Sequence, residues 1–340
     1  MTRPVAVVAF AQTPTVRREE RRNEVEMLMP VVREALEACG LRRQDVGFFV
    51  SGSSDYLAGA PFSFVNALDA IGAWPPVQES HVEMDGAWAL YEAWVRLQHG
   101  DVDVALVYAF GKSSPGRVRE LLALQLDPYL VAPLRPDAVS LAALQARALL
   151  DSGRATEADL AAIAARRRGG DVEALLGEPY VVSPLRRHDC PPVGDGAAVA
   201  ILAAGDRASS LAERPAWIAG IDHRIEPHAL GVRDLSRSPS TQLAGRAAGA
   251  LDAPAEVAEL HAPFSHQELI LRDALGLDEA VDVNPSGGAL AANPLMVAGL
   301  ARIGEAARRV MDGRAGRALA HATSGPCLQQ NLVCVLEARP

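Results

Sequence analysis

Hydrophobic positions along the chain alternate between short apolar runs and longer stretches with helical spacing. Residues 5–10 and 46–50 form apolar runs of strand length, whereas residues 24–39 place their apolar side chains on one helical face. Gly40 ends this helical stretch, because glycine readily takes the left-handed conformation found just after a helix, and Pro30 predicts a kink within it. The alternation is typical of an α/β protein rather than a helical bundle or a β-sandwich.

The same order of elements recurs in the second half of the chain. In the first half, a predicted helix over residues 86–99 leads to an apolar run over residues 102–109. In the second half, a predicted helix over residues 293–309 leads to an apolar run over residues 318–322. This recurrence predicts an internally duplicated α/β fold with two pseudo-repeated halves.

The two halves set the expected domain organisation. The N-terminal half covers residues 1–205 and the C-terminal half covers residues 206–340. Residues 112–184 have no counterpart in the second half and contain a helical stretch over residues 139–152. We interpret residues 112–184 as an inserted loop region that lies over the core.

Composition and charge narrow the classes of function. Of the 340 residues, 49% are hydrophobic, which is enough for a sizeable buried core. Asp and Glu number 42 against 33 Lys and Arg, and the net charge of −9 disfavours nucleic acid or an anionic membrane as a partner. No run approaches the roughly 18 apolar residues that cross a bilayer. We therefore expect neither nucleic-acid binding nor membrane insertion.

The cysteines and the first residues bear on the cellular compartment. Cys39, Cys190, Cys327 and Cys334 show no C-x-x-C spacing, and the start MTRPVAVVAFAQT lacks a basic segment followed by a cleavable apolar one. The sequence thus predicts a reduced, cytoplasmic protein without a structural zinc site.

Several segments, in order along the chain, resemble the thiolase superfamily and in particular its sterol-carrier and lipid-transfer branch. They are VEMDGAWAL at residues 82–90, HDCPPVGDGAAVAILA at 188–203, VAELHAPFSHQEL at 257–269, VNPSGGALAANPLMVAGLA at 283–301 and ATSGPCLQQN at 322–331. The resemblance implies a thiolase-like fold with layers in the order α/β/α/β/α. It also implies a dimer, either homomeric or heteromeric.

Two places that carry thiolase chemistry hold other residues in this chain. Matching Gly86 to the family pattern puts Glu83 where thiolases have the nucleophilic cysteine, and a carboxylate cannot replace a thiolate in thioester exchange. The family's Gly-His-Pro reads Ala292-Asn293-Pro294, and an asparagine cannot exchange a proton near neutral pH. These substitutions remove the groups that Claisen chemistry requires.

Other parts of the family pattern remain. His261 is kept, and the resemblance implies that it polarises the thioester oxygen. The turn made by Ser286, Gly287 and Gly288 is also kept, which implies that these residues help bind the substrate. We therefore take His261, Asn293 and Glu83 as the candidate catalytic residues.

The combination resembles the retro-aldolases of the superfamily, which cleave β-hydroxyacyl-CoA esters, including those of steroid side chains. The resemblance implies an acyl-CoA substrate, no cofactor other than the coenzyme A of that substrate, and no catalytic metal. It also implies a partner protein with a zinc ribbon and an OB fold. The alternative is a non-catalytic subunit that supports an active homologue.

The catalytic base stays open at this stage. Glu83 suits the task if burial raises its pKa, but a carboxylate at a helix N-terminus also stabilises that helix without any catalytic role. His266 and His81 are the alternatives. Because His266 follows His261 by five residues, the two do not share a helical face, and we interpret His266 as a surface side chain.

Three further features are interpreted structurally. The run ARRRGG at residues 165–170 is typical of a solvated turn, with a coenzyme A phosphate site as the alternative. Trp88, Tyr91 and Trp94 recur with helical spacing and favour core packing or a subunit contact. Cys327 lacks the glycine-rich turn that follows the late catalytic cysteine of thiolases, so we expect an inert side chain.

Overall fold

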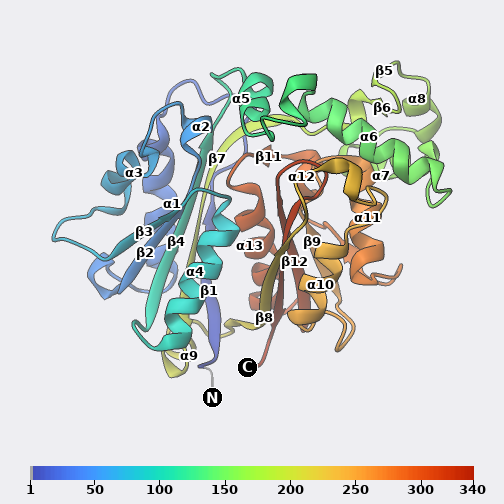
Figure 1. The fold of residues 1–340 in the computed structure, drawn as a ribbon. Coiled ribbons are helices and arrows are strands. Elements are labelled where there is room, and N and C mark those ends of the chain that lie inside the picture. The colour runs from blue at the N-terminus through green and yellow to red at the C-terminus, as the bar shows by residue number, and fades with distance from the viewer. Residues whose placement is uncertain (1–2) are drawn as a thin grey trace.

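The computed structural model describes residues 3–340, which form alternating strands and helices (Figure 1). The strands are β1 (Val5–Gln12), β2 (Phe48–Gly52), β3 (Glu79–Val82), β4 (Val104–Lys112), β5 (Tyr180–Val182), β6 (Leu185–Arg186), β7 (Val193–Ala204), β8 (Ala216–Ile225), β9 (Val257–Leu260), β10 (Asp282–Val283), β11 (Asn293–Pro294), β12 (Arg317–Ser324) and β13 (Gln330–Glu337).

The helices are α1 (Glu24–Ala38), α2 (Asp55–Ala58), α3 (Ser63–Ile71), α4 (Gly86–His99), α5 (Val118–Leu124), α6 (Ala138–Asp151), α7 (Glu157–Arg168), α8 (Val172–Leu176), α9 (Asp206–Leu211), α10 (Pro239–Ala247), α11 (Ser265–Leu275), α12 (Gly288–Ala291) and α13 (Ala298–Met311). Within residues 3–340, no helix combines the length and the apolar character needed to cross a membrane.

The strand order repeats between the two halves. In the first half the order is β3-β2-β4-β7-β1, and in the second it is β10-β9-β12-β13-β8. Taken in this order, the first two pairs of neighbouring strands in each half are parallel, and the last two pairs are antiparallel. The halves join where β1 and β8 pair antiparallel through Ala6–Trp217 and Val7–Ala216. The expected pseudo-repeat is thus present in the fold.

Three hydrophobic clusters show how the layers pack. The central cluster unites residues of α4 and α13 with the inner faces of both sets of strands, and it includes Leu97 and Leu300. A second cluster packs α1 and α3 on the outer face of the first set. A third packs α10 and α11 on the outer face of the second set. The predicted α/β/α/β/α order is confirmed, with α4 and α13 at the centre (Figure 1).

The inserted region lies mainly over the second half. It carries α5 to α8, and α6 contributes Ala142, Ala146 and Leu149 to the third cluster. In Figure 1 this region crosses the top of the molecule. The expected boundary between residues 205 and 206 falls between β7 and β8, and the division into separate domains stays a prediction.

One predicted helix has the wrong start. The helix expected over residues 293–309 begins only at Ala298, because Asn293 and Pro294 form β11 and pair with Val193 and Gly194 of β7. A residue next to proline is disfavoured in helical backbone, which fits an extended conformation at Asn293. This pairing ties the candidate residue Asn293 to the first half of the molecule.

Candidate functional site

The segment before α4 and the segment before α13 meet at the centre of the molecule. The main-chain N–H of Gly86 donates to the carbonyl of Met296 at 2.9 Å. Gly86 has no room for a side chain, since an added Cβ would lie 2.6 Å from Ala109 and 3.0 Å from Leu300. Glu83 lies three residues before Gly86 and Asn293 three residues before Met296, so the two candidate residues lie in adjoining segments.

His261 and Asn293 contact each other directly. His261 follows β9, and its ring nitrogen Nε2 lies 3.2 Å from Oδ1 of Asn293. Because the main-chain N–H of Thr323 donates to Nδ1 of His261 at 3.3 Å, the proton of the neutral ring sits on Nε2 and is donated to Asn293. Both side chains are buried. The structure therefore brings two of the three candidate catalytic residues together.

Burial keeps the His261 ring neutral. Burial, together with smaller effects of the neighbouring His321 and Arg302, lowers the pKa of His261 to about 3. The ring is thus a hydrogen-bond donor at neutral pH and not a general acid with an extra proton. The amide nitrogen of Asn293 makes no hydrogen bond to any residue between 3 and 340, so it is a second available donor.

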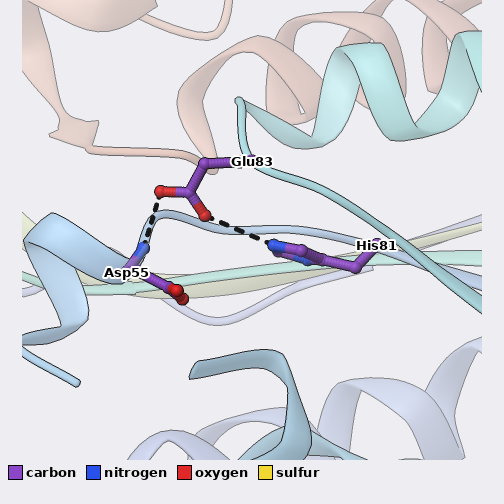
Figure 2. Close-up of side chains that lie close together, drawn as sticks. All are labelled: Asp55, His81 and Glu83. Atoms are coloured by element: carbon purple, nitrogen blue, oxygen red, sulfur yellow. Dashed lines mark hydrogen bonds and ion pairs between the residues drawn. The ribbon is translucent and has the colours of Figure 1, made fainter. Parts of the chain in front are cut away.

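Glu83 makes its hydrogen bonds to other residues, Asp55 and His81 (Figure 2). Its Oε1 accepts the main-chain N–H of Asp55 at 2.8 Å, and its Oε2 lies 3.3 Å from Nε2 of His81. On the other side of the ring, Nδ1 of His81 lies 3.0 Å from the hydroxyl of Ser51, its neighbour across the β2–β3 pair. The Glu83 side chain is 44% exposed, which leaves the carboxylate accessible.

The interpretation of Glu83 as the anion at the start of α4 is wrong. Asp85 has that role: it is the N-cap residue, and its carboxylate accepts the N–H of Ala87 at 2.9 Å. Asp85 also accepts the N–H groups of Gly299 and Leu300 in the first turn of α13, each at 2.9 Å. Burial raises the pKa of Asp85 to about 6, and the hydrogen bonds from these three N–H groups offset part of the effect of burial.

Asp55, His81 and Glu83 are the described residues whose ligand atoms come close enough to hold a metal ion. These atoms lie within 4.8 Å of one another. Both oxygens of the Asp55 carboxylate already accept main-chain N–H groups, from Phe62 at 2.8 Å and Ser63 at 2.9 Å. Figure 2 shows this carboxylate directed away from Glu83, so the group is arranged as a hydrogen-bonded cluster.

The predicted substrate-binding turn rests on a buried ion pair. The Ser286 hydroxyl donates to Oε2 of Glu259 at 2.6 Å, and Arg302 pairs with the same oxygen at 2.8 Å. Gly287 and Gly288 both have a positive φ, and a Cβ on Gly288 would lie 2.9 Å from the Asn284 side chain. Ser286 thus uses its hydroxyl to hold the turn, and a substrate-binding role for the three residues stays a prediction.

The interpretation of His266 as a surface residue is wrong. Its side chain is fully buried in α11, and Nε2 lies 3.2 Å from Oε1 of Gln145. Burial lowers the pKa of His266 to about 3. Because α6 of the inserted region supplies Gln145, the buried ring faces that region. A role of His266 as the base stays a prediction.

The run at the end of α7 is exposed at four positions, as expected of a solvated turn, but two of its arginines also bind other segments. The exposed residues are Arg166, Arg168, Gly169 and Gly170. Arg167 is half-buried and pairs with the buried carboxylate of Glu268 at 3.0 Å. Arg168 donates to the carbonyls of Leu290 at 2.7 Å and Cys190 at 2.6 Å. The run therefore fastens the inserted region to the segment that carries the substrate-binding turn.

The cysteines are all free and buried. Burial raises the pKa of Cys39 and of Cys190 to about 11 and that of Cys327 to about 12, and it also raises the pKa of Cys334. The Cys327 thiol donates to the carbonyl of Leu141. None of these environments favours a thiolate, in agreement with the inert role expected for Cys327.

Sequence comparison links part of the chain to thiolases. No family model matches it. An acetyl-CoA acetyltransferase of Methanothermobacter thermautotrophicus is 29% identical over 173 residues, which are 42% of this chain and 45% of the relative. The 3-oxoadipyl-CoA/3-oxo-5,6-dehydrosuberyl-CoA thiolase of Escherichia coli is 36% identical over 129 residues, 37% of this chain and 31% of the relative. The chain thus spans less than half of the length of either relative.

Structural comparison covers nearly the whole chain. The structure described as Ltp2-ChsH2(DUF35) aldolase aligns with a TM-score of 0.81 at 18% identity, over 98% of both chains. Human mitochondrial 3-ketoacyl-CoA thiolase aligns with a TM-score of 0.78 at 16% identity, over 99% of both chains. At these identities the likeness establishes the fold. The chain therefore has the thiolase fold, and part of its sequence is similar to thiolases.

Proposed function

We propose that the chain is a retro-aldol lyase, or the thiolase-like subunit of one, that cleaves a β-hydroxyacyl-CoA. The observation that carries the proposal is the accessible carboxylate of Glu83 at the place where thiolases have their nucleophilic cysteine. A carboxylate suits the removal of a proton from a hydroxyl group and does not suit the formation of an acyl-enzyme.

The proposed reaction balances without any further reagent. Glu83 removes the proton of the β-hydroxyl group, the oxygen forms a carbonyl, and the Cα–Cβ bond breaks. The electron pair of that bond moves onto the thioester as an enolate, and a ketone or an aldehyde leaves. Protonation of the enolate at Cα then gives the shorter acyl-CoA and regenerates the Glu83 carboxylate.

The neutral pair of His261 and Asn293 supplies donors for the enolate oxygen. The Nε2–H of His261 and the amide nitrogen of Asn293 are both uncharged donors in a buried environment. Donors that are already in place when charge develops contribute about 3–4 kcal/mol each to lowering a barrier. In this proposal the Nε2–H turns from Oδ1 of Asn293 to the thioester oxygen when the substrate binds.

The cysteines support a mechanism without an acyl-enzyme. All four thiols are buried and their pKa values are raised, whereas a catalytic cysteine needs an environment that favours its thiolate. Asn293 removes the second group that thiolase chemistry uses, because an amide cannot exchange protons.

The fold neighbours support the choice of substrate and partner. One of them is described as an aldolase with two named components, Ltp2 and ChsH2(DUF35). By analogy, this chain would act on an acyl-CoA, including a steroid side-chain thioester, as a dimer and together with a zinc-ribbon and OB-fold protein. The thiolase relatives also support a coenzyme A thioester as the substrate.

The direct test is turnover of β-hydroxyacyl-CoA thioesters by the purified protein, alone and as the complex isolated from its native host. We expect equal amounts of a carbonyl product and a shorter acyl-CoA. An absence of cleavage across short-chain, long-chain and steroid side-chain substrates would contradict the proposal.

A non-catalytic supporting subunit is the second candidate. It is favoured by the partners of Glu83, because a carboxylate that accepts the Asp55 N–H already has a structural role. Substitution of His261 by alanine separates the two functions when it is measured in the complex. An enzyme loses about 100-fold or more of its rate, whereas a supporting subunit leaves the rate of the complex unchanged.

A further inference from the structure

Glu83 is the exposed end of a row of three side chains that contact one another in turn. Ser51 of β2 lies opposite His81 of β3, and Glu83 directly follows β3. The hydroxyl of Ser51 lies 3.0 Å from Nδ1 of His81, and Nε2 of the same ring lies 3.3 Å from Oε2 of Glu83 (Figure 2). A hydroxyl, an imidazole and a carboxylate are also the groups of a nucleophile triad.

The burial of the three side chains runs opposite to that of a nucleophile triad. Ser51 is fully buried, the His81 side chain is 17% exposed and the Glu83 side chain is 44% exposed. A nucleophilic hydroxyl has to reach the substrate, and the Ser51 hydroxyl is shielded from it. The group that a substrate can reach is the carboxylate, with the imidazole behind it.

The His81 ring is held in one orientation. Phe64 of α3 stacks on it, with the ring centroids 4.6 Å apart and an angle of 16° between the planes. Because a carboxylate only accepts hydrogen bonds, the proton of the neutral ring sits on Nε2 and is donated to Glu83. Nδ1 is then an acceptor, and the rotatable hydroxyl of Ser51 donates to it. Ser51 therefore favours the tautomer in which His81 faces Glu83 as a donor.

We propose that His81 is a positioning residue that holds the Glu83 carboxylate in one orientation for proton removal. The ring holds Oε2, and the main-chain N–H of Asp55 holds Oε1 at 2.8 Å. Each carboxylate oxygen has about two acceptor positions, so both oxygens can still accept a substrate hydroxyl. The role in proton removal rests on the proposed function of Glu83, whereas the row of contacts does not.

The catalytic part of the test compares two substitutions of His81. His81→Phe keeps a flat ring against Phe64 but loses the donor, whereas His81→Gln keeps an N–H group near the position of Nε2. We expect His81→Phe to lower kcat about 100-fold with little change in KM, because a displaced base loses its reactive geometry, and His81→Gln to recover about tenfold of that loss. His99→Gln, at the exposed end of α4, is the matched control and should keep the native kcat. A native kcat in His81→Phe, or equal losses in both variants, overturns the inference.

The structural part of the test needs no turnover. Nitrogen NMR of protein with isotope-labelled histidine reports which ring nitrogen carries the proton, and the signal that is lost in His81→Gln identifies the ring. At mildly alkaline pH we expect the proton on Nε2 in the native protein and a mixture of both tautomers in Glu83→Ala, which lacks the acceptor. A native ring that is protonated on Nδ1, or that is mixed, overturns the inference. A fixed Nε2–H tautomer in a protein that cleaves no substrate supports the row of contacts and contradicts only the lyase.

Discussion

Asp85 and Leu300, which lie 215 positions apart, are joined by a hydrogen bond of 2.9 Å between the Asp85 carboxylate and the Leu300 main-chain N–H. The same carboxylate accepts the N–H of Ala87 in α4 and of Gly299 in α13. A single buried carboxylate thus accepts hydrogen bonds from main-chain N–H groups in the first turns of both central helices. One of these helices comes from each half of the duplicated fold. This contact fixes the two segments that carry Glu83 and Asn293.

Removal of the Asp85 carboxylate should weaken the whole fold. Asp85→Ala leaves three buried N–H groups without an acceptor, and each loss costs about 1–3 kcal/mol. We expect the free energy of unfolding, measured by urea denaturation, to fall by about 3–5 kcal/mol. The exposed Asp69 of α3 provides the control, since Asp69→Ala should change stability by less than about 0.5 kcal/mol. Similar values for the two variants would refute the role of Asp85.

Glu83→Gln tests the base while keeping the local structure. The amide oxygen of glutamine can still accept the Asp55 N–H, so we expect an unchanged melting temperature. Because glutamine cannot remove a proton, the rate of β-hydroxyacyl-CoA cleavage should fall about 100-fold or more. Glu92→Gln, on the same helix as Arg96 and paired with it, should keep the full rate. A Glu83→Gln enzyme with native activity would exclude Glu83 as the base.

His266 should make the protein sensitive to acid. Its folded pKa is about 3, against about 6.5 in an unfolded chain, so between these values the unfolded state binds the extra proton and stability falls as the pH falls. His261 and His321 act in the same direction. Asp85 acts in the opposite direction between its ordinary pKa of 3.8 and about 6, because its folded form binds the proton.

The measurement compares the free energy of unfolding at pH 7 and pH 5. We expect His266→Gln, which can still donate to Gln145, to lose about 2 kcal/mol less between these pH values than the native protein. His99→Gln, at the exposed end of α4, should lose as much as the native protein. Equal losses in all three proteins would show that the buried ring is not the cause.

Thiol alkylation should leave the activity intact. All four cysteines are buried and their raised pKa values keep them protonated, so iodoacetamide should modify them only slowly in the folded protein and completely in urea. Mass spectrometry follows the modification, and the cleavage assay follows the activity. Rapid inactivation coupled to alkylation of one cysteine would point to ordinary thiolase chemistry.

The duplicated fold could be predicted because its signals are local. Apolar runs such as residues 102–109 and helical spacing over residues 86–99 recur in one order, and the structure places β4 and α4 at these positions. The start of α13 could not be predicted this way. Asn293 is extended because it pairs with Val193, 100 positions earlier in the chain, and such a contact leaves no trace in the local pattern.

The candidate site, too, could be predicted only where its signals are local. His261 and Asn293 were found from motif positions, but their contact depends on β9 and β11 coming together. Asp85 was missed although its signal was present, because an aspartate directly before the first helical residue is a typical N-cap. His266 was misread, and the ion pair of Arg167 was missed, because their partners Gln145 and Glu268 lie more than 100 positions away.

The central claim is that the chain breaks a Cα–Cβ bond without forming an acyl-enzyme. The measurement that tests it most directly is cleavage of a β-hydroxyacyl-CoA in D₂O, with both products and the intact protein analysed by mass spectrometry. We predict one carbonyl product for each shorter acyl-CoA, one deuterium at Cα of that acyl-CoA, and an unmodified protein mass. A requirement for free coenzyme A together with an acylated cysteine would contradict the account.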